Sequence, residues 1–66
     1  MRVIVNGREE ILAEGLPLRD FIHSKGLVPE AYVFMLNDRV LARDELDRIF
    51  LKENDRLEIL RFVGGG

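Results

Sequence analysis

The sequence RVIVNG at residues 2–7 is the best starting point for working out the architecture of this chain. Residues 2–5 form a short, β-branched run, which is typical of a β-strand. Asn6 and Gly7 follow at once, and this pair readily adopts the two positive φ angles of a type I′ turn, the strongest short-range signal for a β-hairpin. Residues 8–12 are therefore predicted to form the returning strand, and their charges are typical of an exposed sheet edge.

A short helix is predicted to follow this hairpin. Pro17 fits the first turn of a helix, where a missing N–H costs nothing. Three apolar side chains then fall at helical spacing and would form one buried face: Leu18, Phe21 and Ile22. Gly26 suits the position just after the helix, because glycine tolerates a positive φ angle. We expect about eight residues of helix, held in place by packing because so short a helix is marginal alone.

The remaining segments predict further strands and one small turn. The expected elements are a strand at 32–36, a turn at Asn37 and Asp38, a pairing strand at 39–41, a helical turn at 43–48 and a last strand at 56–63. We expect the first and last strands to be central neighbours, because they are the most apolar outside 32–36. The order predicts an α+β fold of the β-grasp (ubiquitin-like) type: a mixed sheet of four or five strands with one short helix packed on one face.

Length and composition exclude several classes of protein. Sixty-six residues form one domain, and 47% of them are hydrophobic, which is enough for a core. The chain has no cysteine and one histidine, His23, so a disulfide framework is excluded and a structural zinc site is not expected. A chain of this size has little room for an enzyme pocket, which needs walls around about 300 Å³ or more. We expect a carrier, adaptor or binding module and not an enzyme.

The charge pattern argues against nucleic acid and membrane as partners. Ten basic and twelve acidic residues are interspersed and give a net charge of −2, with no basic stripe that would neutralise phosphates. No apolar run approaches the roughly 18 residues of a membrane span, and the first residues do not read as a signal peptide. A cytoplasmic protein is expected. Asp44, Glu45 and Asp47 lie between Arg43 and Arg48, which indicates a solvated turn whose charges compensate one another and no metal site.

Three glycines stand at the end of the sequence, so we expect a β-grasp domain at 1–63 and a flexible tail at 64–66. Glycine loses the most backbone freedom on ordering and has no side chain to pack, so the tail does not belong to the core. A filament without Cβ atoms can thread a terminal carboxylate through a narrow channel into the active site of another protein. A frayed end or a cloning remnant is the alternative explanation.

Several stretches of the chain resemble the ThiS-like sulfur carriers, a family of ubiquitin-like proteins. They are the opening strand with its Asn-Gly turn, LNDRVLAR at residues 36–43, ENDRLEI at 53–59 and FVGGG at 62–66. The second is similar to the family pattern V-N-G-x-x-V-P-R, and the third to D-G-D-x-x-E-I. Asp38, Ala42 and Leu46 depart from the family's usual glycine, proline and aromatic residue, and all three lie away from the tail.

The resemblance implies a mechanism for the tail. A ThiF-like adenylyltransferase would join the carboxylate of Gly66, which follows Gly65, to AMP; ATP and Mg²⁺ would bind to that enzyme, and this chain would bind no cofactor or metal. Sulfur delivered as a persulfide from a cysteine desulfurase would convert the acyl adenylate to a thiocarboxylate. The carrier would then donate this sulfur to a ThiG-like thiazole synthase, which builds the thiazole ring of thiamine.

Strand alternation predicts a surface by which such enzymes recognise the carrier. With Leu57 and Ile59 facing the helix, the opposite face of the sheet would carry an exposed apolar patch beside the tail. Its predicted members are Ile4, Val33, Met35, Leu60 and Phe62, with Val63 and Gly64 leading from it into the tail. A shift of one residue in the register of the third strand would exchange its two faces. Arg61 either guides the tail toward an acidic groove or is simply solvated.

Other functions remain open at this point. The small subunit of molybdopterin synthase, a MoaD-like carrier, shares the Gly-Gly ending. A ubiquitin-like modifier would attach the same activated tail to a lysine of another protein. A β-grasp binding module of the TGS-like, RNA-binding kind is a different class; the acidic balance of charge disfavours it, and it does not explain the tail.

Overall fold

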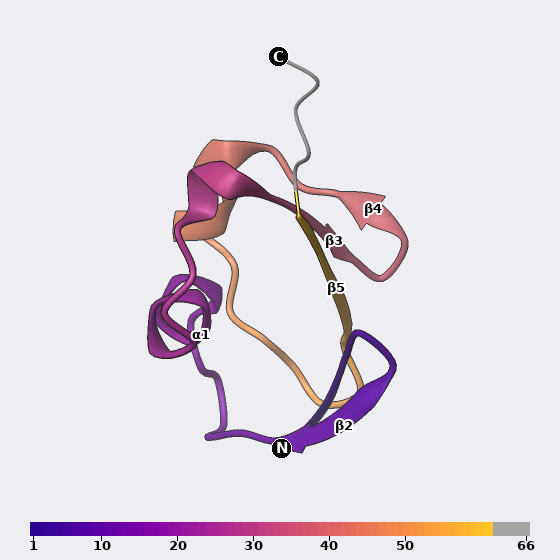
Figure 1. Ribbon diagram of the computed structural model, residues 1–66. Coiled ribbons are helices and arrows are strands. Elements are labelled where there is room, and N and C mark those ends of the chain that lie inside the picture. The colour runs from indigo at the N-terminus through magenta and orange to yellow at the C-terminus, as the bar shows by residue number, and fades with distance from the viewer. Residues whose placement is uncertain (62–66) are drawn as a thin grey trace.

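The computed structural model describes residues 1–61, which form a five-stranded sheet with one α-helix packed against one of its faces (Figure 1). The elements are β1 (Arg2–Val5), β2 (Arg8–Ile11), α1 (Leu18–Ser24), the 3₁₀ turn η1 (Pro29–Ala31), β3 (Tyr32–Leu36), β4 (Arg39–Val40), the 3₁₀ turn η2 (Arg43–Asp47) and β5 (Arg56–Arg61). The predicted sheet with a single helix on one face is confirmed, and the sheet has five strands.

The two ends of the chain supply the central strands of the sheet. The strand order is β2-β1-β5-β3-β4, with β1 and β5 parallel and the other neighbours antiparallel. The prediction that the first and last strands are central neighbours is therefore confirmed, and the sheet is mixed. β5 ends at Arg61, where the grey trace begins in Figure 1. The predicted continuation of this strand through Phe62 and Val63 lies outside the described residues.

The two hairpins turn in the same way. Asn6 and Gly7 connect β1 to β2 with φ angles of 50° and 80°, as the Asn-Gly pair predicts. Asn37 and Asp38 connect β3 to β4 with φ angles of 50° and 71°. Asp38 thus adopts the left-handed conformation that the family's glycine would adopt more readily, since aspartate tolerates this region better than most residues.

Helix α1 begins one residue later than the sequence predicts. Pro17 is extended, with φ −62° and ψ 138°, because it pairs with Phe50 in an isolated antiparallel bridge that draws the segment before the helix against a distant loop. The helix ends as predicted. Gly26 takes a φ of +70°, and its N–H donates to the carbonyl of His23 at 2.9 Å, which satisfies one of the carbonyls left free at the helix end.

The core lies between α1 and the sheet. The predicted helix face is confirmed, since Leu18, Phe21 and Ile22 are each at most 2% exposed. The buried hydrophobic cluster consists of Val3, Val5, Leu18, Phe21, Ile22, Phe34, Leu41, Leu46, Leu51 and Leu57. Every strand near the centre of the sheet contributes to it, so the position of β5 is fixed by packing on its inner face.

The connecting segments agree less closely with the prediction from the sequence. The helical turn expected at 43–48 is observed as η2, and the pairing strand expected at 39–41 is reduced to two residues in β4. The sequence did not predict η1, which begins at Pro29, a residue whose fixed φ angle suits the first turn of a helix. No helix in the described part of the chain is long and apolar enough to cross a membrane.

Candidate functional site

The sheet has one face toward the core and an opposite face, here called the outer face. Val5, Phe34 and Leu57 point into the core. Side chains alternate along each strand, so their neighbours Ile4, Met35 and Glu58 point to the outer face. The register expected for the third strand is therefore the one observed, and its two faces are not exchanged.

Four of the residues predicted to bind partners share this outer face. Val33 lies directly opposite Leu60, and Met35 lies opposite Glu58 in the antiparallel pairing of β3 with β5. Ile4 lies beside Arg56 in the parallel pairing of β1 with β5. Ile4, Val33, Met35 and Leu60 are thus distributed over three adjacent strands on one side of the sheet.

The outer face is hollow and partly apolar. Leu60 is 50% exposed, whereas Ile4, Val33 and Met35 are half-buried. A groove of about 570 Å³ runs beside β5, and its lining includes Ile4, Glu58 and Leu60. Such a groove admits the side chains of a partner, which makes this face suited to binding.

Sequence reasoning missed one residue of this surface. Val40 of β4 pairs with Met35 and is 59% exposed, so it extends the apolar part of the outer face to the edge of the sheet. The length of the turn between β3 and β4 could have predicted the position of Val40. A two-residue turn at 37–38 places Leu36 opposite Arg39 and Met35 opposite Val40, so Val40 has to share the face of Met35.

An exposed ion pair borders the apolar residues of the outer face. Both terminal nitrogens of Arg56 donate to the carboxylate of Asp38, at 2.7 and 3.4 Å. These hydrogen bonds and the positive charge of Arg56 hold the pKa of Asp38 below its ordinary value of 3.8, and Asp38 raises the pKa of Arg56. Because the pair is exposed, it balances charge at this surface more than it stabilises the fold.

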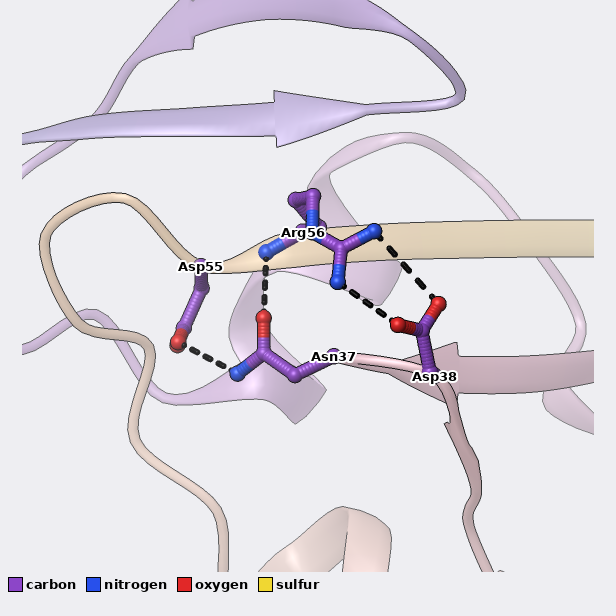
Figure 2. A network of polar contacts seen from close by, with 4 residues as sticks. All are labelled: Asn37, Asp38, Asp55 and Arg56. Atoms are coloured by element: carbon purple, nitrogen blue, oxygen red, sulfur yellow. Dashed lines mark hydrogen bonds and ion pairs between the residues drawn. The ribbon is translucent and has the colours of Figure 1, made fainter.

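A polar network fixes the start of β5 (Figure 2). The side-chain amide of Asn37 donates to the carboxylate of Asp55 at 3.0 Å and accepts the backbone N–H of Arg56 at 2.8 Å. The second oxygen of Asp55 accepts the backbone N–H of Lys52 at 2.8 Å. Asp55 is only 8% exposed, so both of its oxygens need these partners. The β3–β4 turn and the segment before β5 are therefore held together.

A second asparagine fixes β5 near its other end. The side-chain oxygen of Asn6 accepts the backbone N–H of Ile59 at 2.8 Å, and its amide nitrogen donates to the carbonyl of Ile59 at 3.3 Å. β1 ends at Val5 because the backbone turns at Asn6. The side chain of Asn6 therefore makes the hydrogen bonds to β5 that the next residue of a longer β1 would make. The strand that leads to the tail is thus positioned to within two residues of its last described residue.

Arg61, the last residue of β5, contacts Tyr32 of β3. Its guanidinium carbon lies 5.8 Å from the centre of the Tyr32 ring, and Nη1 donates to the Tyr32 hydroxyl at 3.3 Å. The two residues lie directly opposite each other in the register, on the side of the sheet that faces α1. The side chain of Arg61 is exposed to solvent and has this one specific neighbour, so neither alternative for Arg61 is excluded.

The rest of the predicted site falls outside the described residues. These positions are Phe62, Val63, Gly64, Gly65 and Gly66, which include the predicted reacting carboxylate. The structure describes the end of β5, which precedes these residues in the chain. There Leu60 lies on the outer face and Arg61 on the opposite side of the sheet.

The acidic turn η2 binds arginines. Glu45 accepts the backbone N–H of Ala42 at 2.7 Å and pairs with Arg39 at 2.8 Å. These contacts, the backbone hydrogen bond first, lower the pKa of Glu45 from its ordinary value of 4.5. A proline at position 42, as is usual in the ThiS-like pattern, would have no N–H to donate.

The other carboxylates of η2 also have basic partners. Asp47 binds Arg19 of α1, and Asp44 lies 3.8 Å from Arg48. In residues 1–61, no three His, Cys, Asp or Glu side chains are grouped so that they could hold a metal ion. His23 is exposed on α1 beside a hollow of about 200 Å³ on the helix side of the molecule.

Comparison with known proteins identifies relatives along the whole chain. The model of the ThiS family matches residues 1–66. A crystal structure of the thiamine biosynthesis protein ThiS from Geobacter metallireducens matches with a TM-score of 0.87 and 32% identity, covering all of both chains. An NMR solution structure of a thiamine biosynthesis protein from the same organism matches with a TM-score of 0.80 and 32% identity, covering all of this chain and 88% of that one. These matches confirm the β-grasp fold.

A curated relative is longer. A thiazole synthase from Magnetococcus marinus is 29% identical over 66 residues, which cover all of this chain and 20% of that protein. The chain therefore spans about a fifth of the length of that relative.

Proposed function

The chain belongs to the ThiS family, and on this basis we propose that it is a sulfur carrier of thiamine biosynthesis. The observation that carries the proposal is the match of the entire chain both to the family and to a ThiS structure of the same fold. The outer face supports the proposal, because a carrier needs a recognition surface more than it needs an enclosed pocket of its own.

In this proposal Gly66 is the last residue and its carboxylate is the reacting group. A ThiF-like adenylyltransferase joins this carboxylate to AMP, and ATP and Mg²⁺ bind to that enzyme. The terminal sulfur of a persulfide on a cysteine desulfurase then attacks the acyl adenylate and displaces AMP, and a thiol reduces the S–S bond of the resulting acyl disulfide, so that the chain carries a thiocarboxylate. Gly66 has no Cβ beside the reacting carbonyl, so the carbonyl is open to attack from either face, and Gly65 adds no side chain next to it. The chain has no cysteine, so no internal thiol competes for the activated acyl group.

A thiazole synthase is the proposed acceptor of the sulfur. The relative from Magnetococcus marinus bears that name, and a stretch of it aligns with the whole of this chain. A protein that is named a thiazole synthase therefore contains a segment similar to this chain. This supports the proposal that the chain, as a carrier, delivers sulfur to a ThiG-like enzyme. In this proposal the carrier is a substrate of its partner enzymes, and those enzymes catalyse the reactions.

The outer face is the proposed docking surface for both enzymes. Its apolar members are distributed along β5 from Ile4, beside Arg56, to Leu60, near the end from which the tail continues, so an enzyme that binds there also lies close to the start of the tail. The residues assigned to it are Ile4, Val33, Met35, Val40 and Leu60, followed along the chain by Phe62, Val63 and Gly64.

Intact-mass spectrometry tests this proposal. The purified chain is incubated with a ThiF-like adenylyltransferase, ATP, Mg²⁺, a cysteine desulfurase and cysteine, and the expected product is heavier by the exchange of one oxygen for one sulfur. The untreated sample checks that the chain ends at Gly66. A variant that lacks Gly65 and Gly66 is the matched control and should show no change.

Two results would contradict the proposal. The first is an unchanged mass with enzymes that convert another ThiS protein in parallel. The second is a covalent conjugate to a lysine of another protein, which would indicate a ubiquitin-like modifier. Addition of a thiazole synthase with its other substrates should then return the thiocarboxylate to the carboxylate, whereas turnover only with molybdopterin synthase would indicate the MoaD-like pathway.

A further inference from the structure

Arg61 carries a charge that no carboxylate of residues 1–61 neutralises. Arg2 pairs with Glu9 at 2.9 Å and Arg56 with Asp38 at 2.7 Å, whereas Arg8, in the edge strand β2, has no ion pair in residues 1–61 and lies two strands away from Arg61. Arg61 forms no ion pair within the described part of the chain, although it ends the strand that leads to the tail. An arginine in this state is available to an acidic group of another molecule.

Tyr32 holds this guanidinium in place. The ring lies 5.8 Å from the guanidinium carbon, a cation–π distance, and the hydroxyl accepts a hydrogen bond from Nη1. Tyr32 packs against the core, and its ring centre lies 6.4 Å from that of the buried Phe34. The side chain of Arg61 is therefore partly ordered before any partner arrives, which lowers the entropy that binding has to remove.

Leu60 and Arg61 lie on opposite sides of β5. Leu60 shares the outer face with Val33, and Arg61 shares the other side with Tyr32. An enzyme that encloses the chain beyond β5 meets both sides of the strand at once. One wall of its entrance then faces an apolar side chain, and the other wall faces a fixed positive charge.

We propose that Arg61 is a specificity-determining residue that binds a carboxylate at the entrance to the tail channel of the activating enzyme; this inference rests on the proposed function. A guanidinium binds a carboxylate through two parallel hydrogen bonds, which fixes both distance and orientation. Gly66 is five positions after Arg61, and a fully extended chain of that length would span about 17 Å, so a tail extended in the channel would place the reacting group well beyond Arg61. It acts on recognition and not on the chemical step.

Kinetics of ATP–pyrophosphate exchange test this role. Initial rates are measured against carrier concentration with a purified ThiF-like adenylyltransferase. Arg61→Gln should raise KM for the carrier about tenfold with kcat unchanged, because it removes a charge-assisted bond made on binding. Arg61→Glu should raise KM further, and Arg61→Lys should lie between wild type and Arg61→Gln. Tyr32→Phe keeps the ring and loses the hydroxyl, so its KM should rise by less than that of Arg61→Gln.

Lys52→Gln is the matched control. Lys52 is an exposed cation without an ion pair in residues 1–61, and it precedes the opposite end of β5, so this variant changes the net charge equally. Its KM should equal that of wild type, and added salt should raise the KM of wild type toward that of Arg61→Gln. Equal KM values for Arg61→Gln and Lys52→Gln, or a fall in kcat with KM unchanged in Arg61→Gln, would overturn the inference. A wild-type chain that the enzyme does not activate would instead refute the proposed function.

Discussion

Asn6 binds both backbone polar groups of Ile59, although 53 residues separate them in the chain. Asn6 belongs to the first turn and Ile59 to the last strand. Its side-chain amide offers one donor and one acceptor, as a strand neighbour would, and so it lengthens the pairing of β1 with β5 by one residue. The residue that makes the first hairpin turn thereby also fixes the strand from which the tail continues.

Replacement of Asn6 should loosen the end of β5. Asn6→Gly keeps the positive φ angle that the turn requires but loses both bonds to Ile59, so unfolding should become easier by about 1–2 kcal/mol. The amide proton of Ile59 should exchange faster in hydrogen-exchange NMR. Asn6→Asp is the matched variant, since it keeps the acceptor for that N–H and removes only the donor. An unchanged exchange rate at Ile59 in Asn6→Gly would show that the two hydrogen bonds from Asn6 do not stabilise this part of β5.

Asp55→Asn should destabilise the start of β5. Asp55 accepts hydrogen bonds from Asn37 and from the backbone of Lys52, one at each oxygen. An asparagine there has a single acceptor oxygen, so its NH₂ would meet one of the two donors, and a buried donor left unsatisfied costs about 1–3 kcal/mol. Chemical denaturation measures the loss. Asp38→Asn is the control on the same turn, and its effect should be smaller because the Asp38–Arg56 pair is exposed.

Leu57→Ala should come close to unfolding the domain. Leu57 is 0% exposed in the central strand, and truncation of a buried leucine to alanine typically costs about 2–5 kcal/mol. A domain of this length rarely has more than about 3–5 kcal/mol in total. Thermal unfolding followed by circular dichroism should show a broad transition shifted to much lower temperature. A shift of only a few degrees would mean that the core adapts to the missing side chain.

Acid should weaken the fold through Asp38 and Glu45. Contacts in the folded state lower the pKa of both carboxyls, Asp38 through Arg56 and Glu45 through Ala42 and Arg39. Their ionised forms therefore stabilise the fold above the ordinary pKa values of 3.8 and 4.5, and this contribution is lost as the pH falls through the lower folded values.

The melting temperature should thus be flat near neutral pH and decline below about pH 4.5. A double variant, Asp38→Asn with Glu45→Gln, should show a shallower decline at acid pH, because it removes two of the groups that take up protons on unfolding. A decline equally steep in wild type and in the double variant would assign the acid sensitivity to other carboxyls.

Leu60→Asp should block activation without unfolding the chain. Leu60 is half exposed on the outer face opposite Val33, so a charge there disrupts an apolar contact with the enzyme while the core is untouched. The expected result is a loss of at least about tenfold in kcat/KM for adenylation, with the melting temperature within a few degrees of wild type. Phe50→Asp, at another exposed apolar residue 59% open to solvent, should have no such effect. Equal activity of the two variants would remove the outer face as the docking surface.

The sequence by itself determined the strands and the α-helix and four members of the outer face. The Asn6-Gly7 turn, the apolar face of α1 and the alternation along β3 and β5 are local properties, because each follows from backbone sterics or from the period of one element. Alternation along three strands assigned Ile4, Val33, Met35 and Leu60 to one face, whereas Val40 was missed. Family membership followed from stretches that keep their order along the chain.

Only the tertiary structure decided which polar side chains meet across elements. Asn6 with Ile59, Asn37 with Asp55 and Arg61 with Tyr32 are each brought together by the central place of β5 between β1 and β3. A hydrogen bond depends on distances correct to a few tenths of an ångström, and such distances arise when strands far apart in sequence pack on a shared core. No local pattern encodes them, which is why the contact of Arg61 with Tyr32 could not be predicted from the sequence.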